Sequence, residues 1–147
     1  MVWSFAAVGF AAAAALILWP KEAVAPAPGP IHLASSTLLD GDVSAPVTLD
    51  EGSRIIPSSG GVVSILANGP SAVTALVSEG RARFEITPGG PRRWTLECGI
   101  AQVEVVGTVF TIDRTEERVQ VDVERGVVLV RSAHLPEGVM RLQAGES

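Results

Sequence analysis

The sequence predicts an all-β domain over residues 37–147. Short apolar runs in this region alternate with clusters of glycine, proline, aspartate and serine at intervals of roughly 8–12 residues, which is typical of strands joined by turns. The apolar residues do not repeat with the 3.6-residue period of a helix. Aliphatic residues supply most of the 47% hydrophobic content, whereas aromatic residues make up only 5%. We therefore expect many short strands, arranged as a sandwich or as a twisted, solenoid-like coil of sheets.

An apolar segment, residues 1–20, precedes this domain and is predicted to be a transmembrane anchor. Val2–Trp19 is apolar apart from Ser4, and its length as a helix approaches the thickness of a bilayer core. A cleaved signal peptide is the alternative, because Ala23-Val24-Ala25 has the A-x-A form of a cleavage site. The absence of a basic region after Met1 favours the uncleaved anchor.

Residues 21–36 are predicted to form a spacer between the anchor and the β domain. Ala23–Pro30 contains three prolines and a glycine in eight residues, a composition typical of extended, unpacked chain. The spacer would hold the domain away from the membrane surface.

The expected strands follow in order through residues 37–147. In Arg81–Thr87 and Arg118–Glu124, apolar and polar residues alternate, which predicts one buried and one solvated face for each strand. The full set of expected strands is Thr37–Leu39, Val47–Leu49, Arg54–Ile56, Val62–Leu66, Ala72–Val77, Arg81–Thr87, Arg93–Cys98, Ala101–Val106, Val109–Asp113, Arg118–Glu124, Val127–Arg131 and Val139–Gln143.

The stretch Ala101–Asp113 carries a further signal. Val103 and Val105 place the buried face at odd positions, whereas Phe110 and Ile112 place it at even positions. A flat, continuous strand cannot change parity, so a β-bulge or a sharp bend is expected at Gly107-Thr108. An ordinary turn between two short strands is the alternative.

The alternation also predicts which side chains form the core. Cys98, the one cysteine of the sequence, shares its parity with Trp94 and Leu96, so a small buried side chain is favoured over a reactive thiol. The predicted core residues are Ala82, Phe84, Ile86, Trp94, Leu96, Val103, Val105, Phe110, Ile112, Val119, Val121 and Val123.

Composition and motifs argue against several classes of function. The net charge of −5 disfavours a nucleic-acid partner, and a single cysteine rules out both an internal disulfide and a cysteine-based zinc site. His32 and His134 lie in a linker and a loop without recognisable partners, and Asp40-Gly41-Asp42 is better explained as a turn than as a calcium loop. Glu116-Glu117 is best explained as a solvated hairpin tip. We predict no catalytic residues, no metal site and no cofactor.

Two arginines are candidates for contacts with a partner. Arg92 and Arg93 follow Gly89-Gly90-Pro91 and precede Trp94, so an exposed loop there could bind a protein or a glycan. The alternative is a structural loop that turns Trp94 into the core, and the parity of Trp94 favours it.

Several motifs in a fixed order resemble the FecR domain. These are Gly107, Thr108 and Phe110 in a G-T-x-F element, the run Val121–Gly126 that ends on Gly126, and Leu142 with Gly145-Glu146 at the end. The G-T-x-F element alone is weakly specific, but the ordered set is more so.

The resemblance implies a protein-binding role in signalling, without a cofactor. FecR-type regulators lie in the inner membrane of Gram-negative bacteria, sense an outer-membrane receptor through a periplasmic domain and control an extracytoplasmic-function sigma factor. They carry a cytoplasmic anti-sigma region before the span, whereas here the apolar segment follows Met1 directly. We therefore expect these 147 residues by themselves not to bind a sigma factor. An anchored envelope scaffold or polysaccharide-binding module is the alternative function.

Overall fold

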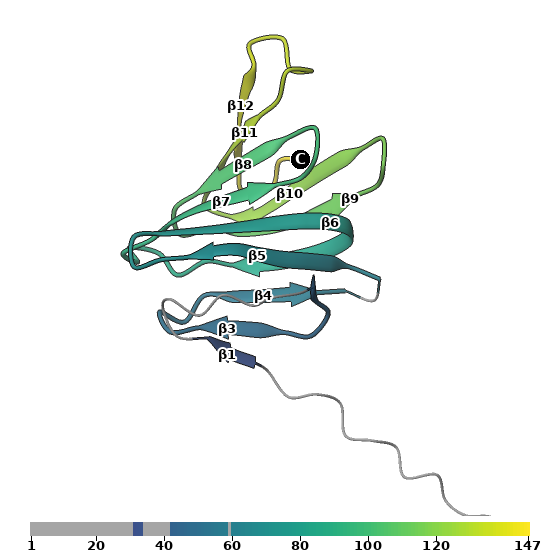
Figure 1. Cartoon of the computed structure of the whole chain (residues 1–147). Coiled ribbons are helices and arrows are strands. Elements are labelled where there is room, and N and C mark those ends of the chain that lie inside the picture. The colour runs from purple at the N-terminus through teal and green to yellow at the C-terminus, as the bar shows by residue number, and fades with distance from the viewer. Residues whose placement is uncertain (1–30, 34–41, 59) are drawn as a thin grey trace, which may run out of the picture.

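The computed structural model describes residues 31–33, 42–58 and 60–147, and these residues form strands and connecting loops without a helix. Figure 1 shows the strands stacked from β1 to β12 along the domain. The strands are β1 (Ile31–Leu33), β2 (Asp42–Val43), β3 (Val47–Leu49), β4 (Arg54–Pro57), β5 (Val62–Asn68), β6 (Ala72–Glu85), β7 (Arg93–Glu97), β8 (Gln102–Val105), β9 (Val109–Arg114), β10 (Val119–Arg125), β11 (Val127–Arg131) and β12 (Val139–Gln143).

The all-β prediction is confirmed, with differences at the beginning of the domain. β1 lies within the residues assigned to the spacer, yet it pairs in parallel with β3, so the sheet reaches back to Ile31. β2 was not predicted, because two residues are too few to show alternation. The expected strand Thr37–Leu39 lies outside the described residues.

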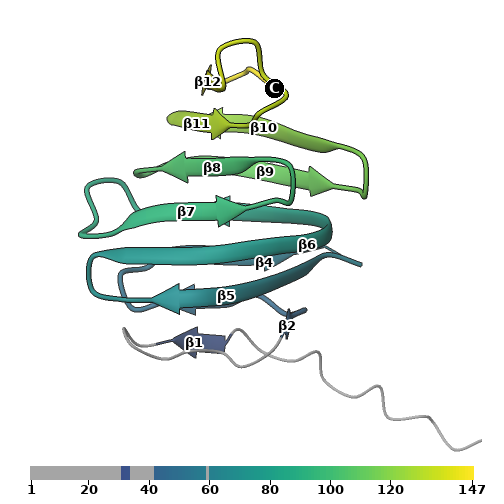
Figure 2. The same ribbon diagram turned by 45° about the horizontal axis from the view of Figure 1, so that its top comes forward.

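The strands form one mixed hydrogen-bonded network that folds into two sheets. Sheet A has the order β1-β3-β4-β6-β9-β10, and sheet B has the order β2-β5-β6-β7-β8-β11-β12. β6 belongs to both, since Ala72–Leu76 pairs with β7 in sheet B and Gly80–Glu85 pairs with β9 in sheet A. Figure 2 shows the two sheets as front and rear layers.

The path of the chain combines a coil with hairpins. After β6 passes from sheet B to sheet A, the loop of residues 86–92 returns to sheet B, where β7 lies parallel to the first half of β6. The remaining strands form antiparallel hairpins that alternate between the sheets: β7 with β8 in sheet B, β9 with β10 in sheet A, and β11 with β12 in sheet B. The domain is thus a two-layer arrangement that contains one solenoid-like turn.

Gly80 is the residue at which β6 changes sheet. The sequence analysis predicted two strands here, whereas the structure has one strand whose buried positions change from odd at Val77 to even at Ala82. Gly80 has φ +71°, and a Cβ on it would lie 2.5 Å from the carbonyl oxygen of Gly60. A residue without a side chain is therefore required, and the strand bends there instead of ending.

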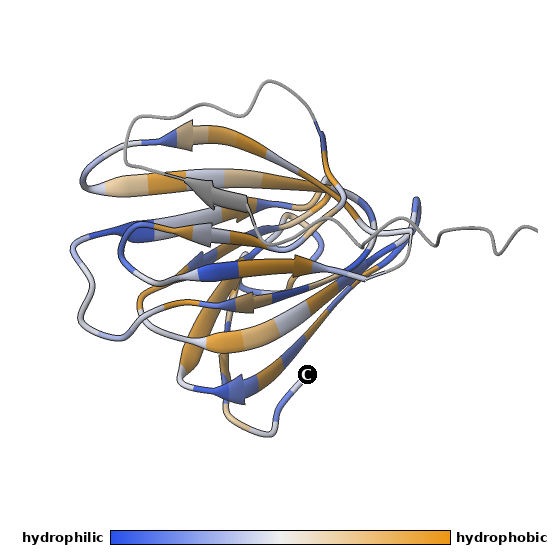
Figure 3. Cartoon of the chain, turned by 90° about the horizontal axis from the view of Figure 1, so that it is seen from below, coloured by the Kyte–Doolittle hydropathy of each residue, from blue (hydrophilic) through white to orange (hydrophobic). Residues whose placement is uncertain are grey.

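One hydrophobic core fills the space between the sheets. In Figure 3 hydrophobic and hydrophilic residues alternate along strands of both layers. All of the predicted core residues are buried except Val119, which is partly buried and packs against the core. Burial of each Val, Leu, Ile or Phe contributes about 1.5–3 kcal/mol. Additional core residues come from the first strands, namely Val43, Val47, Leu49, Ile55, Val63, Ile65, Val73, Ala75 and Val77.

The predicted membrane anchor, residues 1–20, lies outside the described residues. Within the described ranges, no helix has the length and apolar character needed to span a bilayer. The anchor stays a prediction.

Candidate partner-binding surface

Gly107 forms a corner of the domain, where the chain leaves β8 in sheet B and enters β9 in sheet A. Its φ is +78°, and a Cβ on it would lie 2.5 Å from the Cα of Pro88. The predicted bend at Gly107-Thr108 is thus confirmed, and the change of parity from Val105 to Phe110 follows from the change of sheet.

Thr108 and Gly126 complete this corner. The hydroxyl of Thr108 is buried and donates a hydrogen bond of 3.0 Å to the carbonyl oxygen of Val127. A Cβ on Gly126 would lie 3.1 Å from the carbonyl oxygen of Gly107. Phe110, two residues past Thr108, is fully buried, and its ring stacks on that of Phe84 with centroids 5.2 Å apart. Four of the motif residues therefore build the corner and the core beneath it.

Gly145 lies elsewhere and joins the end of the chain to sheet A. Its φ is +89°, and its N–H donates a hydrogen bond of 2.8 Å to the carbonyl oxygen of Val123. The N–H of Val123 in turn donates to the carbonyl oxygen of Glu146 at 3.0 Å. The carboxylate of Glu146 accepts a bond from the N–H of Gln143 at 2.7 Å. These residues carry the chain from β12 in sheet B to β10 in sheet A.

Arg92 and Arg93 are placed in opposite environments. Arg92 is only 5% exposed, and its guanidinium lies 2.8 Å from a carboxylate oxygen of Glu51. It also donates to Asp50 and, at 3.0 Å, to the side-chain oxygen of Asn68. Arg93 is exposed and has no ion-pair partner within the described part of the chain. Of the two predicted contact residues, Arg93 alone presents its charge at the surface.

Glu51, one of the two acidic partners of Arg92, is itself in an unusual environment. Desolvation by burial raises the pKa of Glu51, and the positive charge of Arg92 opposes this change. Arg92 joins the turn after β3, the end of β5 and the loop before β7, because its partners come from the first two of these segments. Arg92 therefore holds in place the loop from which Arg93 projects.

A shallow hollow of about 510 Å³ lies on the outer face of sheet B beside the Gly107 corner. A neighbouring hollow of about 440 Å³ shares Arg93 and Val106 with it, so the two are adjacent. We call the first hollow the sheet B trough. It is lined by Arg93, Glu104, Val105, Val106, Gly107, Gly126, Val127 and Leu129.

The lining of the trough is mainly apolar. Val106 is 63% exposed, and Val127 and Leu129 are partly exposed, although they lie in or beside regular strands. The one carboxylate of the trough, Glu104, is paired with Arg131 at 3.2 Å. Apolar residues that face solvent beside an unpaired arginine are typical of a protein-contact surface.

The sequence analysis did not identify the trough beyond Arg93 and the two glycines. Two signals for it were present: Val106 is apolar at an outward position of the expected strand Ala101–Val106, and the run Val127–Val130 is apolar on both faces. The neighbouring arginine of β12, Arg141, could not have been placed from the sequence. It pairs in register with Leu129, which lies 12 residues earlier.

The remaining candidate residues are structural or exposed. Cys98 is fully buried, as predicted, and burial raises the pKa of its thiol to about 12. His134 lies in an exposed loop, and Asp42 accepts a hydrogen bond of 2.6 Å from the hydroxyl of Ser64. In the ranges that the structure covers, no three His, Cys, Asp or Glu side chains are grouped so as to hold a metal ion.

Comparison with known proteins places this arrangement in context. A family model described as FecR protein matches residues 35–129. Two crystal structures of a candidate anti-sigma factor from Parabacteroides distasonis, at 2.50 Å and 1.65 Å resolution, are similar to the chain, with 26% sequence identity and TM-scores of 0.59 and 0.56. The similarity covers 70% of this chain and 51% of theirs, so the chain spans about half the length of those proteins. A comparison with curated proteins gave no match.

Proposed function

The chain belongs to the FecR protein family, and on that premise we propose that it is the envelope domain of a transmembrane signalling system that regulates a sigma factor. The match to the FecR family over residues 35–129 is the observation that carries this proposal. The likeness to a candidate anti-sigma factor supports it. In this role the domain binds partner proteins of the envelope, such as an outer-membrane receptor.

The topology we propose is a single span of the inner membrane, with the β domain in the periplasm. The 18-residue segment Val2–Trp19, apolar apart from Ser4, supports a span, and the proline-rich spacer supports a domain held off the bilayer. A signal peptide in the same position would instead release the domain into the periplasm.

The trough is the surface that we propose for partner contacts. The exposed Val106 and the partly exposed Val127 and Leu129 favour a protein over a polysaccharide, because sugar rings are commonly bound by stacking on aromatic side chains, and the residues that line the trough include none. A polysaccharide-binding or scaffold role remains the second function to be tested.

Fractionation of cells tests the topology. The full chain should remain in membranes after a carbonate wash, and its β domain should be digested by protease added to the periplasmic side. A chain that lacks residues 1–30 should be lost from the membrane fraction. Recovery of the full chain in the soluble periplasmic fraction would instead support a cleaved signal peptide.

Deletion of the gene in its host tests the signalling role. We expect transcription that depends on an extracytoplasmic-function sigma factor to change, and the change to be reversed by the full gene. Unchanged sigma-dependent transcription, together with disassembly of an envelope complex in the deletion strain or binding of polysaccharide by the purified protein, would support the scaffold or polysaccharide-binding function.

A further inference from the structure

We propose that the sheet B trough binds an extended, acidic segment of a partner protein. The proposal rests on the proposed function for one point, that the partner is a protein. It adds the chemistry and the conformation of the segment that is bound.

The shape of the trough fits an extended chain. The trough crosses the ends of β8 and β11, and the neighbouring hollow, which shares Arg93 and Val106 with it, continues it past the beginning of β7. Gly107 and Gly126 line the trough without side chains of their own, so a bound backbone can approach closely. The exposed side chain of Val106 and the partly exposed Leu129 provide apolar contacts for side chains of the segment.

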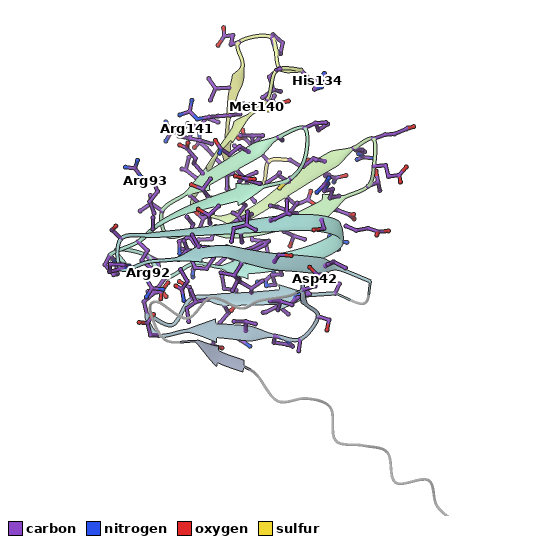
Figure 4. All side chains as sticks on the ribbon, viewed as in Figure 1. Asp42, Arg92, Arg93, His134, Met140 and Arg141 are labelled. Carbon is purple, nitrogen blue, oxygen red and sulfur yellow. The ribbon has the colours of Figure 1, made fainter. Side chains whose placement is uncertain are left out.

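The charge around the trough selects an acidic segment. Arg93 and Arg141 are exposed and have no ion-pair partner among the described residues, whereas Glu104 is neutralised by Arg131. Figure 4 shows Arg93 and Arg141 projecting on the same side of the domain. In a chain with a net charge of −5, this surface is locally positive. Carboxylates of a partner would be attracted here and basic groups would be repelled.

The spacing of the two arginines sets the spacing of the carboxylates. Arg141 is in register with Leu129, Leu129 with Glu104, and Glu104 with Thr95, which lies two residues from Arg93. Three strand spacings of about 4.8 Å and two residues of about 3.3 Å separate the arginines by roughly 16 Å. An extended segment covers this distance in about five residues. Because residues of an extended segment share a face only at even separations, the segment should carry acidic residues four positions apart, with an apolar residue midway between them. Their Cα atoms lie about 13 Å apart, and their side chains reach the remaining distance.

Binding of a labelled peptide to the full chain in detergent micelles tests the proposal. The probe is the blocked peptide Glu-Ser-Leu-Ser-Glu, in which both glutamates and the leucine share one face of the extended chain, and the matched control peptide has lysine at both acidic positions. We expect the acidic peptide to bind at least about tenfold more tightly than the control in fluorescence anisotropy, and its affinity to fall as salt rises. Amide NMR signals of Val106, Gly107 and Leu129 should shift.

Charge reversal locates the site. The double variant Arg93→Glu/Arg141→Glu should weaken binding of the acidic peptide at least about tenfold. Arg81→Glu is the control for a charge reversal away from the trough, because Arg81 is exposed on sheet A and likewise has no ion-pair partner in the described residues. This control should change the affinity less than about twofold, and circular dichroism should show both variants folded.

Several results would overturn the proposal. These are equal affinity for the acidic and basic peptides, an equal loss of binding in the Arg81→Glu control, NMR shifts confined to other surfaces, or shifts of the trough amides by a neutral oligosaccharide alone. If the peptide fails to bind while deletion of the gene still alters sigma-dependent transcription, only this inference fails. If the peptide binds as expected and transcription is unchanged, the proposed function fails and the chemistry of the trough stands.

Discussion

The outer faces of the two sheets differ in how their charges are satisfied. On sheet A, Glu85 is paired with Arg54 at 3.3 Å and with Arg83 at 3.1 Å, and Arg83 also pairs with Glu124. The hydrogen bonds that Arg83 donates to Glu124 and Glu85 raise its pKa. On sheet B, apolar side chains lie beside Arg93, whose charge has no partner within the described ranges. Sheet A thus presents a network of paired charges, with Arg81 outside that network among the described residues, whereas sheet B presents apolar surface beside Arg93.

The outer faces of both sheets are supported by one hydrophobic core. A substitution that leaves a large cavity in that core should therefore destabilise both sheets and remove the difference between their outer faces. Phe110→Ala should lower the free energy of unfolding by about 3–5 kcal/mol, because Phe110 is fully buried and stacks on Phe84. Chemical denaturation measures this change. A loss below about 1 kcal/mol would show that the two sheets do not share a packed core at this position.

A substitution at Gly107 should disrupt the corner beside the trough and leave the ion pairs of sheet A unchanged. Gly107→Val should cost about 2–4 kcal/mol, because valine would have to adopt φ +78° and its Cβ would overlap Pro88. The intrinsic strand preference, which spans about 1 kcal/mol, would favour valine.

Gly138→Val is the matched control for this substitution. Gly138 also has positive φ, but nothing lies within 4 Å of a Cβ there, so the variant reports strain without overlap. Its loss of stability in chemical denaturation should be the smaller of the two. If the Gly107→Val protein melts at or above the melting temperature of the parent, the conclusion that Gly107 forms a strained, closely packed corner is wrong.

The neighbouring arginines offer a direct contrast between an internal and an external charge. Arg92→Met should lower the free energy of unfolding by about 1–3 kcal/mol, because Glu51 would keep its burial and lose its positive partner. Arg93→Met, at an exposed position without an ion pair in the described residues, should change it by less than about 0.5 kcal/mol. Equal losses would show that the contrast between the two arginines is wrong.

The cost of Arg92→Met should depend on pH. Burial raises the pKa of Glu51 in the folded protein above its ordinary value of 4.5. Protonation of this carboxyl therefore stabilises the folded state fully below pH 4.5, and this stabilisation is lost as the pH rises through the raised pKa. Without Arg92 the ionised carboxylate is harder to bury. The difference in stability between parent and variant should therefore be largest near neutral pH and should shrink as the pH falls towards 4.5 and below.

The smallest effect is expected on the paired face. Arg83→Gln removes two ion pairs of sheet A, but the side chains involved are 31–48% exposed, so the loss should stay below about 1 kcal/mol and should diminish in high salt. Binding of the acidic peptide should be unchanged. A loss of binding equal to that of the Arg93→Glu/Arg141→Glu protein would mean that the two faces do not differ in the way described.

The sequence by itself determined the strands and the core where alternation is clear. Val119–Val123 and Ala82–Ile86 each bury one parity, so their strands and buried faces could be predicted from the order of residues alone. The bend at Gly107 was also predictable, because a change of parity is a local signal. A change of parity also lies between Val77 and Ala82, where the sequence analysis predicts two strands and the structure has one bent strand.

Only the tertiary structure decided which distant segments meet. The sequence around Arg92 is typical of a surface loop. The burial of Arg92 depends on Glu51 and Asn68, which lie 41 and 24 residues earlier. The trough likewise needs β7, β8 and β11 side by side and Arg141 in register with Leu129. Alternation specifies which face of a strand is buried, but strand order and register arise from packing and hydrogen bonding between segments far apart in the chain, and these carry no local signal.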